Sequence, residues 1–263
     1  MPLIAQLSDI HFGTEDREAL DAAAACLAET QPDMMVVCGD VTQRGRRREF
    51  AAAAEWLSQF DVPKLVVPGN HDTPLLNLAA RASAPFARFD RYFADVKDCA
   101  AAAGVVAVGL NTARGWQVRR NWAEGSVDLE DLDAAIARAG AADAGLRILA
   151  CHHPFRSLPD APLRTRTRRG GRACKRVADS PVDLLLTGHV HTPSSVPRLY
   201  PSGGYLAVAA GTLSTRLRAA PPSFNLIRAS RDEVRIEACL IEAGRVRKEQ
   251  LARYTPGAET ITR

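Results

Sequence analysis

The 263-residue chain has little lysine, few aromatic side chains and no long apolar run. Lysine supplies only four residues, so the net charge of +4 is carried by arginine, and with abundant alanine this suggests a GC-rich genome rather than nucleic-acid binding. The longest apolar stretch, Ala100–Leu110, is broken by two glycines and is far shorter than the roughly 20 residues that span a bilayer. Met1–Asp9 lacks the basic and apolar regions of a signal peptide. We therefore expect no membrane association.

Cysteine is also sparse, and the chain has no CxxC motif. The six cysteines are scattered: Cys26, Cys38, Cys99, Cys151, Cys174 and Cys239. This pattern favours reduced thiols over a disulfide framework. We expect a cytoplasmic protein.

Short apolar runs alternate with amphipathic stretches along the first 210 residues. The runs predict strands at Leu3–Leu7, Met34–Cys38, Lys64–Val67, Val105–Leu110, Arg147–Cys151, Asp183–Leu186 and Tyr205–Ala209. The amphipathic stretches predict helices near Glu15–Glu29, Arg46–Phe60, Leu129–Ala139 and Gly171–Ala178. Such alternation is typical of an α/β fold with helices covering the sheets.

The chain after Gly211 has a different pattern. Three consecutive strands with short turns are predicted: Phe224–Ala229, Glu233–Ile241 and Val246–Ala252. We expect these C-terminal strands to be antiparallel. With no linker in the sequence, residues 1–255 form one expected domain and residues 256–263 a fraying tail.

All six histidines lie in short motifs of metal-ligand type, beside Asp, Asn and Gly. The motifs are Asp9-Ile10-His11, Gly69-Asn70-His71-Asp72, His152-His153-Pro154 and Gly188-His189-Val190-His191, and Gly39-Asp40 adds a further carboxylate. Each follows a predicted strand. Since the carboxyl ends of parallel strands share one edge of a sheet, these side chains are expected to meet there.

The ligand chemistry predicts a metal site. Carboxylates, imidazoles and an amide suit Mn²⁺, Fe²⁺/Fe³⁺, Zn²⁺ or Co²⁺, and they outnumber the ligands of one ion. Two ions sharing a carboxylate, about 3.5–4 Å apart, would satisfy them and would promote displacement at phosphorus.

The ordered set DxH, GDxxxxG, GNHD, HHP and GHxH, over residues 9 to 191, resembles the calcineurin-like metallophosphoesterases. The resemblance implies a four-layer α/β/β/α sandwich. It also implies two ligand sets with a bridging Asp40: one of Asp9, His11, Asp40 and His191, the other of Asp40, Asn70, His152 and His189. Either His152 or His153 could be the ligand; the family pattern favours His152, which stands two residues before the proline.

The resemblance gives His71 a role at the leaving-group oxygen, as proton donor or charge stabiliser, with Asp72 as the expected orienting carboxylate. Asn111, Arg114 and His153 are candidate substrate-binding residues.

Among branches of the family, the chain resembles the bacterial 3′,5′-cyclic-nucleotide phosphodiesterases, through Leu7–His11, the HHP motif and Asn111–Arg114. The expected partner is thus a small phosphodiester. A glycerophosphodiester or nucleic-acid substrate and a catalytically silent metal-binding regulator are the alternatives.

The basic segment 156–176 predicts either a contact with substrate phosphate or a solvated loop, and nucleic acid is the less favoured ligand. The C-terminal ribbon could mediate a homodimer.

Overall fold

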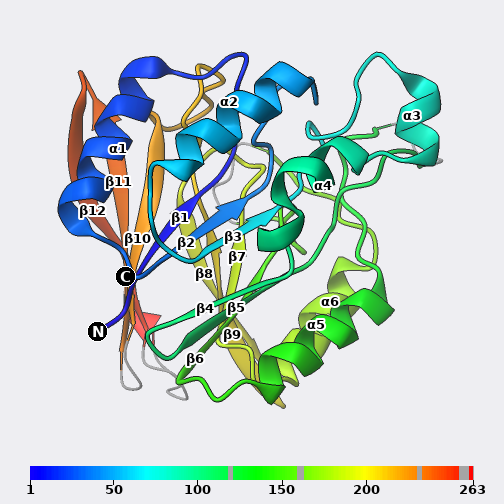
Figure 1. The fold of residues 1–263 in the computed structure, drawn as a ribbon. Coiled ribbons are helices and arrows are strands. Elements are labelled where there is room, and N and C mark those ends of the chain that lie inside the picture. The colour runs from blue at the N-terminus through cyan, green and yellow to red at the C-terminus, as the bar shows by residue number, and fades with distance from the viewer. Residues whose placement is uncertain (118–120, 159–162, 230–232, 255–260, 263) are drawn as a thin grey trace.

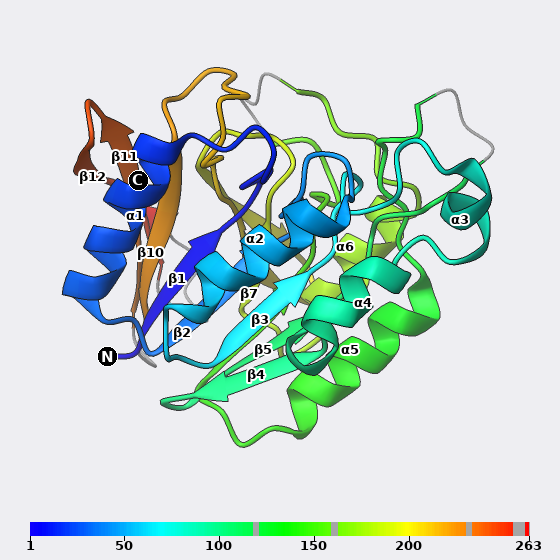
Figure 2. The same cartoon turned by 45° about the horizontal axis from the view of Figure 1, so that its top comes forward.

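Two β-sheets packed face to face form the centre of the protein, and helices cover the outer face of each (Figures 1 and 2). The structure is a computed structural model that describes residues 1–117, 121–158, 163–229, 233–254 and 261–262. The order of the layers is helix, sheet, sheet, helix. The expected four-layer α/β/β/α sandwich is therefore confirmed.

The first sheet combines a parallel N-terminal part with an antiparallel C-terminal ribbon. Its order is β13-β12-β11-β10-β1-β2-β3. The strands are β1 (Leu3–Leu7), β2 (Met34–Cys38), β3 (Lys64–Val67), β10 (Ser223–Ala229), β11 (Val234–Glu242), β12 (Arg245–Tyr254) and β13 (Ile261–Thr262). The predicted antiparallel C-terminal strands are confirmed as β10, β11 and β12. In the expected tail, residues 256–260 and 263 lie outside the described residues, while β13 pairs with β12.

The second sheet has the order β4-β5-β6-β7-β9-β8. Its strands are β4 (Cys99–Ala102), β5 (Val105–Gly109), β6 (Leu146–Ala150), β7 (Leu184–Thr187), β8 (Ser194–Tyr200) and β9 (Gly203–Ala209). The strand patterns missed β4 and β8, the two antiparallel edge strands. β4 is mostly alanine, and β8 contains Pro197, a residue tolerated only where one side of a strand is unpaired.

Helices α1 (Arg17–Thr30), α2 (Arg47–Ser58) and α4 (Ala87–Phe93) cover the first sheet, and α5 (Leu129–Ala141) and α6 (Gly170–Ala178) cover the second. The short helices α3 (Leu78–Ser83), α4 and η1 (Ala94–Val96) were not predicted, because one or two turns give too short a periodicity to recognise. None of the helices described in the structure is both long and apolar enough to cross a membrane.

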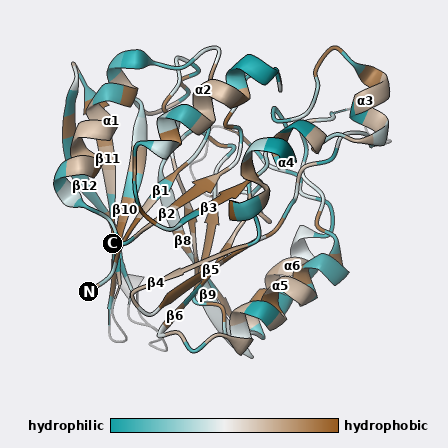
Figure 3. Cartoon of the chain, in the orientation of Figure 1, coloured by the Kyte–Doolittle hydropathy of each residue, from teal (hydrophilic) through white to brown (hydrophobic). Residues whose placement is uncertain are grey.

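Strand β1 shows how side-chain alternation builds the layers. Leu3, Ala5 and Leu7 pack against the helices, whereas Ile4 packs between the two sheets. Figure 3 shows the hydrophobic strands enclosed by helices with hydrophilic outer surfaces. Gln6 also points between the sheets, and its Nε2 donates to the carbonyl oxygen of Thr187 at 3.0 Å. The end of β1 is thereby fixed beside the end of β7, and the same edge carries the histidine motifs.

Candidate metal centre

The polar motifs at the carboxyl ends of β1, β2, β3, β6 and β7 come together at one edge of the sandwich. Potential ligand atoms within 4.8 Å of one another form three groups. The groups are Asp9–His11–His191, Asp9–Asp40–His152 and His152–His153–His189. The carboxylates lie between two histidine clusters, as expected for a centre with a shared acidic ligand. Asn70 lies beside the third group, because its Oδ1 is 3.2 Å from Nε2 of His153.

The backbone at this edge is strained. Five residues that carry candidate ligands have positive φ angles of 51° to 70°: Asp9, His11, Asp40, His189 and His191. Left-handed backbone costs free energy for residues other than glycine, and it persists where surrounding structure enforces it. The chain therefore turns sharply after β1, β2 and β7 and directs these side chains into the shared site.

One carboxylate oxygen of Asp9 accepts hydrogen bonds, and the other has no hydrogen-bond partner. Oδ2 accepts hydrogen bonds from Ser8 Oγ at 2.6 Å and from the backbone N–H of His189 at 2.8 Å. Oδ1 is buried without a well-oriented hydrogen bond and faces Nε2 of His191 at 3.0 Å and Nε2 of His11 at 3.7 Å. A buried carboxylate oxygen facing imidazole nitrogens is suited to bind a cation.

Hydrogen bonds to backbone carbonyls assign the protons on two of the rings. Nδ1 of His191 donates to the carbonyl oxygen of Arg216 at 2.6 Å, and Nδ1 of His152 donates to that of Cys38 at 2.8 Å. When the rings are neutral, Nε2 therefore carries a lone pair and no proton. For His152 this atom is buried without a hydrogen-bond partner, 3.3 Å from Oδ2 of Asp40. Both rings thus present a metal-binding nitrogen to a carboxylate, with a backbone acceptor holding the ring from behind.

Neither ring nitrogen of His153 is available to bind a metal ion. Its Nε2 donates to the carbonyl oxygen of Ala123 at 3.0 Å and faces Asn70 Oδ1, and its Nδ1 pairs with the hydroxyl of Thr112 at 3.0 Å. The backbone N–H of His153 also donates to that hydroxyl. Of the adjacent pair, His152 therefore has the geometry of a ligand, and His153 holds Asn70.

Four of the histidines divide into two classes by the direction of their pKa shifts. Burial lowers the pKa of His11 and of His189 to about 3, so both rings are neutral. For His152, burial also lowers the pKa, but the negative charges of Asp40 and Asp9 outweigh it and raise the pKa to about 9. The same balance, with Asp9 as the main partner, raises the pKa of His191. A cation bound among these side chains would replace the protons on His152 and His191.

His71 lies beside the ligand clusters and is held by groups other than the expected carboxylate. Its Nδ1 donates to the carbonyl oxygen of Gln43 at 2.8 Å, and its Nε2 is 3.0 Å from Nη1 of Arg216. Asp72 was expected to orient this ring, and that expectation is wrong. Its buried carboxylate instead accepts hydrogen bonds from Gly69, Val41 and the N–H and hydroxyl of Thr42, so it ties the β2 and β3 loops together.

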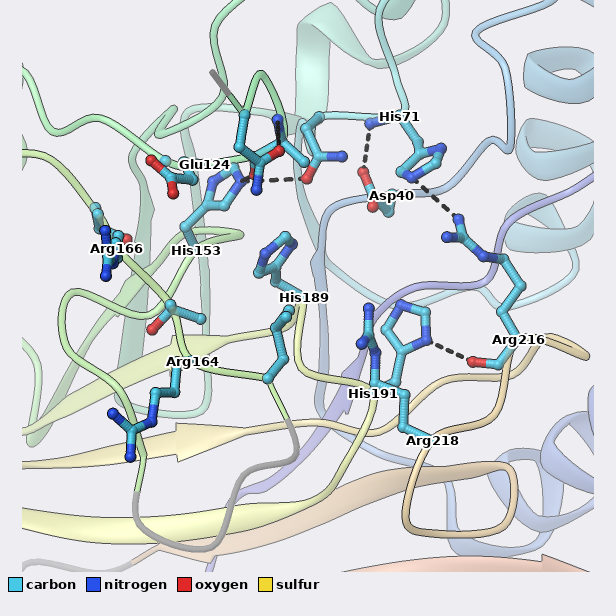
Figure 4. A pocket seen from close by; sticks show the side chains of 17 residues that line it. Asp40, His71, Glu124, His153, Arg164, Arg166, His189, His191, Arg216 and Arg218 are labelled. Carbon is cyan, nitrogen blue, oxygen red and sulfur yellow. Dashed lines mark hydrogen bonds between the residues drawn. The ribbon is translucent and has the colours of Figure 1, made fainter. Parts of the chain in front are cut away.

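These side chains border a cavity of about 200 Å³ (Figure 4). Its lining includes Asp40, Asn70, His71, His153, His189 and His191. Four arginines also line it: Arg164, Arg166, Arg216 and Arg218. Figure 4 shows Arg164 and Arg166 on one side of the histidines and Arg216 on the other. Two members of the basic segment 156–176 thus reach the cavity.

The structure does not place Asn111 or Arg114 in the described lining of this cavity. Asn111 Oδ1 accepts from its own segment, at the backbone N–H of Ala113, in an Asx turn. The nearby Thr112, which was not predicted, is the residue that meets the site, through His153.

Arg216 and Gln43 were also missed. Gln43 lies inside the GDxxxxG motif, so its position was a usable signal. Arg216 follows β9 without a recognisable motif, and no local signal could have identified it.

The sequence profile described as calcineurin-like phosphoesterase matches residues 2–193. Two named relatives match shorter segments. A probable cyclic nucleotide phosphodiesterase of Synechococcus is 29% identical over 80 residues, which are 27% of this chain and 31% of the relative. A glycerophosphodiester phosphodiesterase of Enterobacter lignolyticus is 32% identical over 81 residues, 27% of this chain and 29% of the relative. The matched segments span less than a third of either relative.

Solved structures share the fold at low sequence identity. A purple acid phosphatase from yellow lupin superposes with a TM-score of 0.61 at 11% identity, over 94% of this chain and 52% of the phosphatase. Vacuolar protein sorting protein 29 from Cryptosporidium parvum superposes with a TM-score of 0.52 at 16% identity, over 97% of this chain and 98% of the other. These similarities concern the fold alone.

Proposed function

The chain belongs to the calcineurin-like phosphoesterase family, and from this premise we propose that it is a dinuclear metal-dependent phosphodiesterase acting on a 3′,5′-cyclic nucleotide. The family is one of phosphoesterases, and the carboxylates and imidazoles of this chain form groups suited to hold metal ions. The proposal concerns the activity, the number of metals and the substrate. It rests above all on one observation: Oδ2 of Asp40 lies 3.9 Å from Nε2 of His11 and 3.3 Å from Nε2 of His152, so that a single carboxylate can serve two ions.

In the proposed centre, Asp9, His11, Asp40 and His191 hold one ion, and Asp40, Asn70, His152 and His189 hold the other. The unsatisfied Oδ1 of Asp9 and the lone pair on Nε2 of His152 support this assignment. Mn²⁺, Fe²⁺/Fe³⁺, Zn²⁺ and Co²⁺ all suit the ligands, including a mixed-valence pair. When bound, the ions would lower the pKa of a water molecule and neutralise charge on the phosphoryl oxygens.

The residues around the ions have separable tasks. His71 lines the cavity and would protonate or stabilise the departing alkoxide. His153 would hold the amide of Asn70, and Asp72 would keep the loops that carry Asp40 and Asn70 in register. The arginines in the lining favour an anionic substrate.

The choice of a cyclic nucleotide draws on the relative named as a cyclic nucleotide phosphodiesterase and on the motif resemblance. A glycerophosphodiester is the alternative suggested by the other relative. A nucleic acid and a catalytically silent regulatory role are further alternatives.

The free cysteines of the chain are consistent with a cytoplasmic location. A homodimer formed through the C-terminal ribbon is a separate proposal to test.

The decisive experiment is hydrolysis of cyclic AMP and bis(p-nitrophenyl) phosphate by the Mn²⁺-reconstituted protein. Asp40→Ala removes the shared ligand, and Asp143→Ala removes an exposed carboxylate as the matched control. Turnover of both substrates by the wild type and the control variant, lost in Asp40→Ala, is expected. Turnover of the chromogenic diester alone would disprove the cyclic-nucleotide substrate, and the absence of any turnover would favour the regulatory alternative.

A further inference from the structure

The guanidinium of Arg216 is bonded to the imidazole of His71 in a way that defines the state of the ring. Nη1 of Arg216 lies 3.0 Å from Nε2 of His71, and Nδ1 of His71 lies 2.8 Å from the carbonyl oxygen of Gln43. Arginine can only donate, and a carbonyl oxygen can only accept. His71 is therefore neutral, with its proton on Nδ1 and a lone pair on Nε2 that Arg216 occupies.

This state cannot donate a proton from Nε2. Nδ1 faces backbone, and Nε2, the nitrogen at the guanidinium, holds no hydrogen. If His71 acts on the leaving group, Nε2 must first be released from Arg216 and acquire a proton. The side chain that caps Nε2 therefore controls when His71 can act.

Arg216 is anchored so that its guanidinium can change partners. The backbone carbonyl oxygen of Arg216 accepts a hydrogen bond from Nδ1 of His191, and its backbone N–H donates to Ser214 Oγ at 3.3 Å. These bonds hold the backbone beside the metal centre whatever position the side chain takes. Nη1 contacts Gln43 Oε1 at 3.2 Å as well as His71. Within the described part of the chain, Nε and Nη2 make no hydrogen bond. The half-buried side chain lines the cavity and thus has donors left for an anion there.

We propose that Arg216 is a substrate-binding residue that leaves Nε2 of His71 for a phosphoryl oxygen when the phosphodiester enters the cavity. The proposal rests on the proposed function and adds to it the residue that couples phosphate binding to release of His71. Guanidinium is suited to this exchange, because it bonds phosphate oxygens through charge-assisted hydrogen bonds that are stronger than one to a neutral imidazole.

The structure shows the capped form, with Nη1 of Arg216 at Nε2 of His71. Arg216 returns to this position when phosphate leaves the cavity.

A binding experiment tests the exchange without turnover. The ¹⁵N-histidine-labelled, Zn²⁺-loaded full chain is titrated with orthophosphate, and His71→Asn assigns the His71 signals. We expect an unprotonated Nε2 in the free protein, a change at this nitrogen on adding phosphate, and phosphate affinity that is roughly 10- to 100-fold weaker in Arg216→Met. Arg218→Met removes the same charge from the same cavity and is the matched control. Equal weakening in the two variants, or a phosphate-insensitive Nε2, would overturn the proposal.

Kinetics with a series of aryl methyl phosphates separates phosphate binding from a purely positioning role. Arg216→Met should lower kcat/KM by a similar factor for every leaving group, and Arg216→Lys should restore part of it as higher KM with near-normal kcat. A loss that grows with leaving-group pKa and vanishes in a His71→Asn background would show that Arg216 acts only through His71 and would overturn the proposal. Phosphate binding through Arg216 in a wild type without turnover would uphold the proposal and contradict the proposed function.

Discussion

Oδ1 of Asp9 lies 3.0 Å from Nε2 of His191, although neither atom carries a proton when His191 is neutral. Nδ1 of that ring is committed to a backbone carbonyl, so the pair is stable only with a second proton on His191 or with a cation between the two atoms. His152 and Asp40 repeat the arrangement at 3.3 Å. Protons and metal ions therefore compete for the same places.

This competition predicts that metal binding releases protons. In the metal-free protein the pKa of His152 is raised to about 9, so the ring is protonated at pH 8 and must become neutral to bind. We expect release of about one proton or more per protein at pH 8, and an apparent Mn²⁺ affinity that rises with pH up to about 9. Calorimetric titration in buffers of different ionisation enthalpy measures this. Heats that do not depend on the buffer would contradict it.

The same pKa sets the sign of a stability effect. The folded-state pKa of His152 lies above its ordinary value of 6.5, so the stabilisation it brings to the metal-free fold is complete below pH 6.5 and is lost as pH rises through 9. Loaded protein should not show this loss, because the metal replaces the proton.

The adjacent histidines should respond differently to substitution. His152→Ala removes a proposed ligand, and we expect loss of one bound ion. His153→Phe leaves the ligands but releases Asn70, and second-layer changes of this kind typically weaken metal binding by roughly 10- to 100-fold. Metal stoichiometry and affinity for each variant, measured by elemental analysis and titration, test the assignment. The reverse pattern would make His153 the ligand.

Gly188 is predicted to be required for the orientation of Asp9. A Cβ atom here would lie 1.7 Å from Ser8 Oγ and 2.6 Å from Asp9 Oδ2. We expect Gly188→Ala to destabilise the protein by about 1–3 kcal/mol and to weaken metal binding. Adding Ser8→Ala should recover part of the stability, since it removes the closest atom. Gly171→Ala, whose Cβ would lie 3.8 Å from the nearest atom, is the control. Thermal unfolding that places both glycine variants at the same midpoint would refute the prediction.

Asp72→Asn tests the role that the structure gives to this carboxylate. The amide presents N–H groups to a cluster of backbone donors, and leaving these buried donors without their acceptor should cost about 1–3 kcal/mol in the free energy of unfolding. Thr42→Val, which removes one of these bonds, should cost about 1 kcal/mol. Chemical denaturation measures both. Unchanged stability with a selective loss of activity towards poor leaving groups would restore Asp72 as the partner of His71.

Much of the fold was predictable because the information was local. The strands from Leu3, Met34 and Lys64 match the predicted bounds, since continuous β-branched and apolar runs are typical of strands buried on both faces. The edge strand with Pro197 and the short helices α3 and α4 were missed, because their propensities are weak and tertiary packing decides them.

The candidate metal ligands and their meeting at one sheet edge were predictable from the sequence alone, since each motif follows a strand and parallel strands share their carboxyl edge. Only the tertiary structure decides which nitrogen of each ring is free. That depends on carbonyl groups of Cys38, Gln43 and Arg216, which lie 25 to 114 residues away from their partners. Every residue carries a backbone carbonyl, so no sequence pattern reveals which carbonyl accepts the hydrogen bond. The sequence also indicates His71, but only the folded chain shows the Arg216 guanidinium that caps it, because Arg216 lies 145 residues away and stands in no motif.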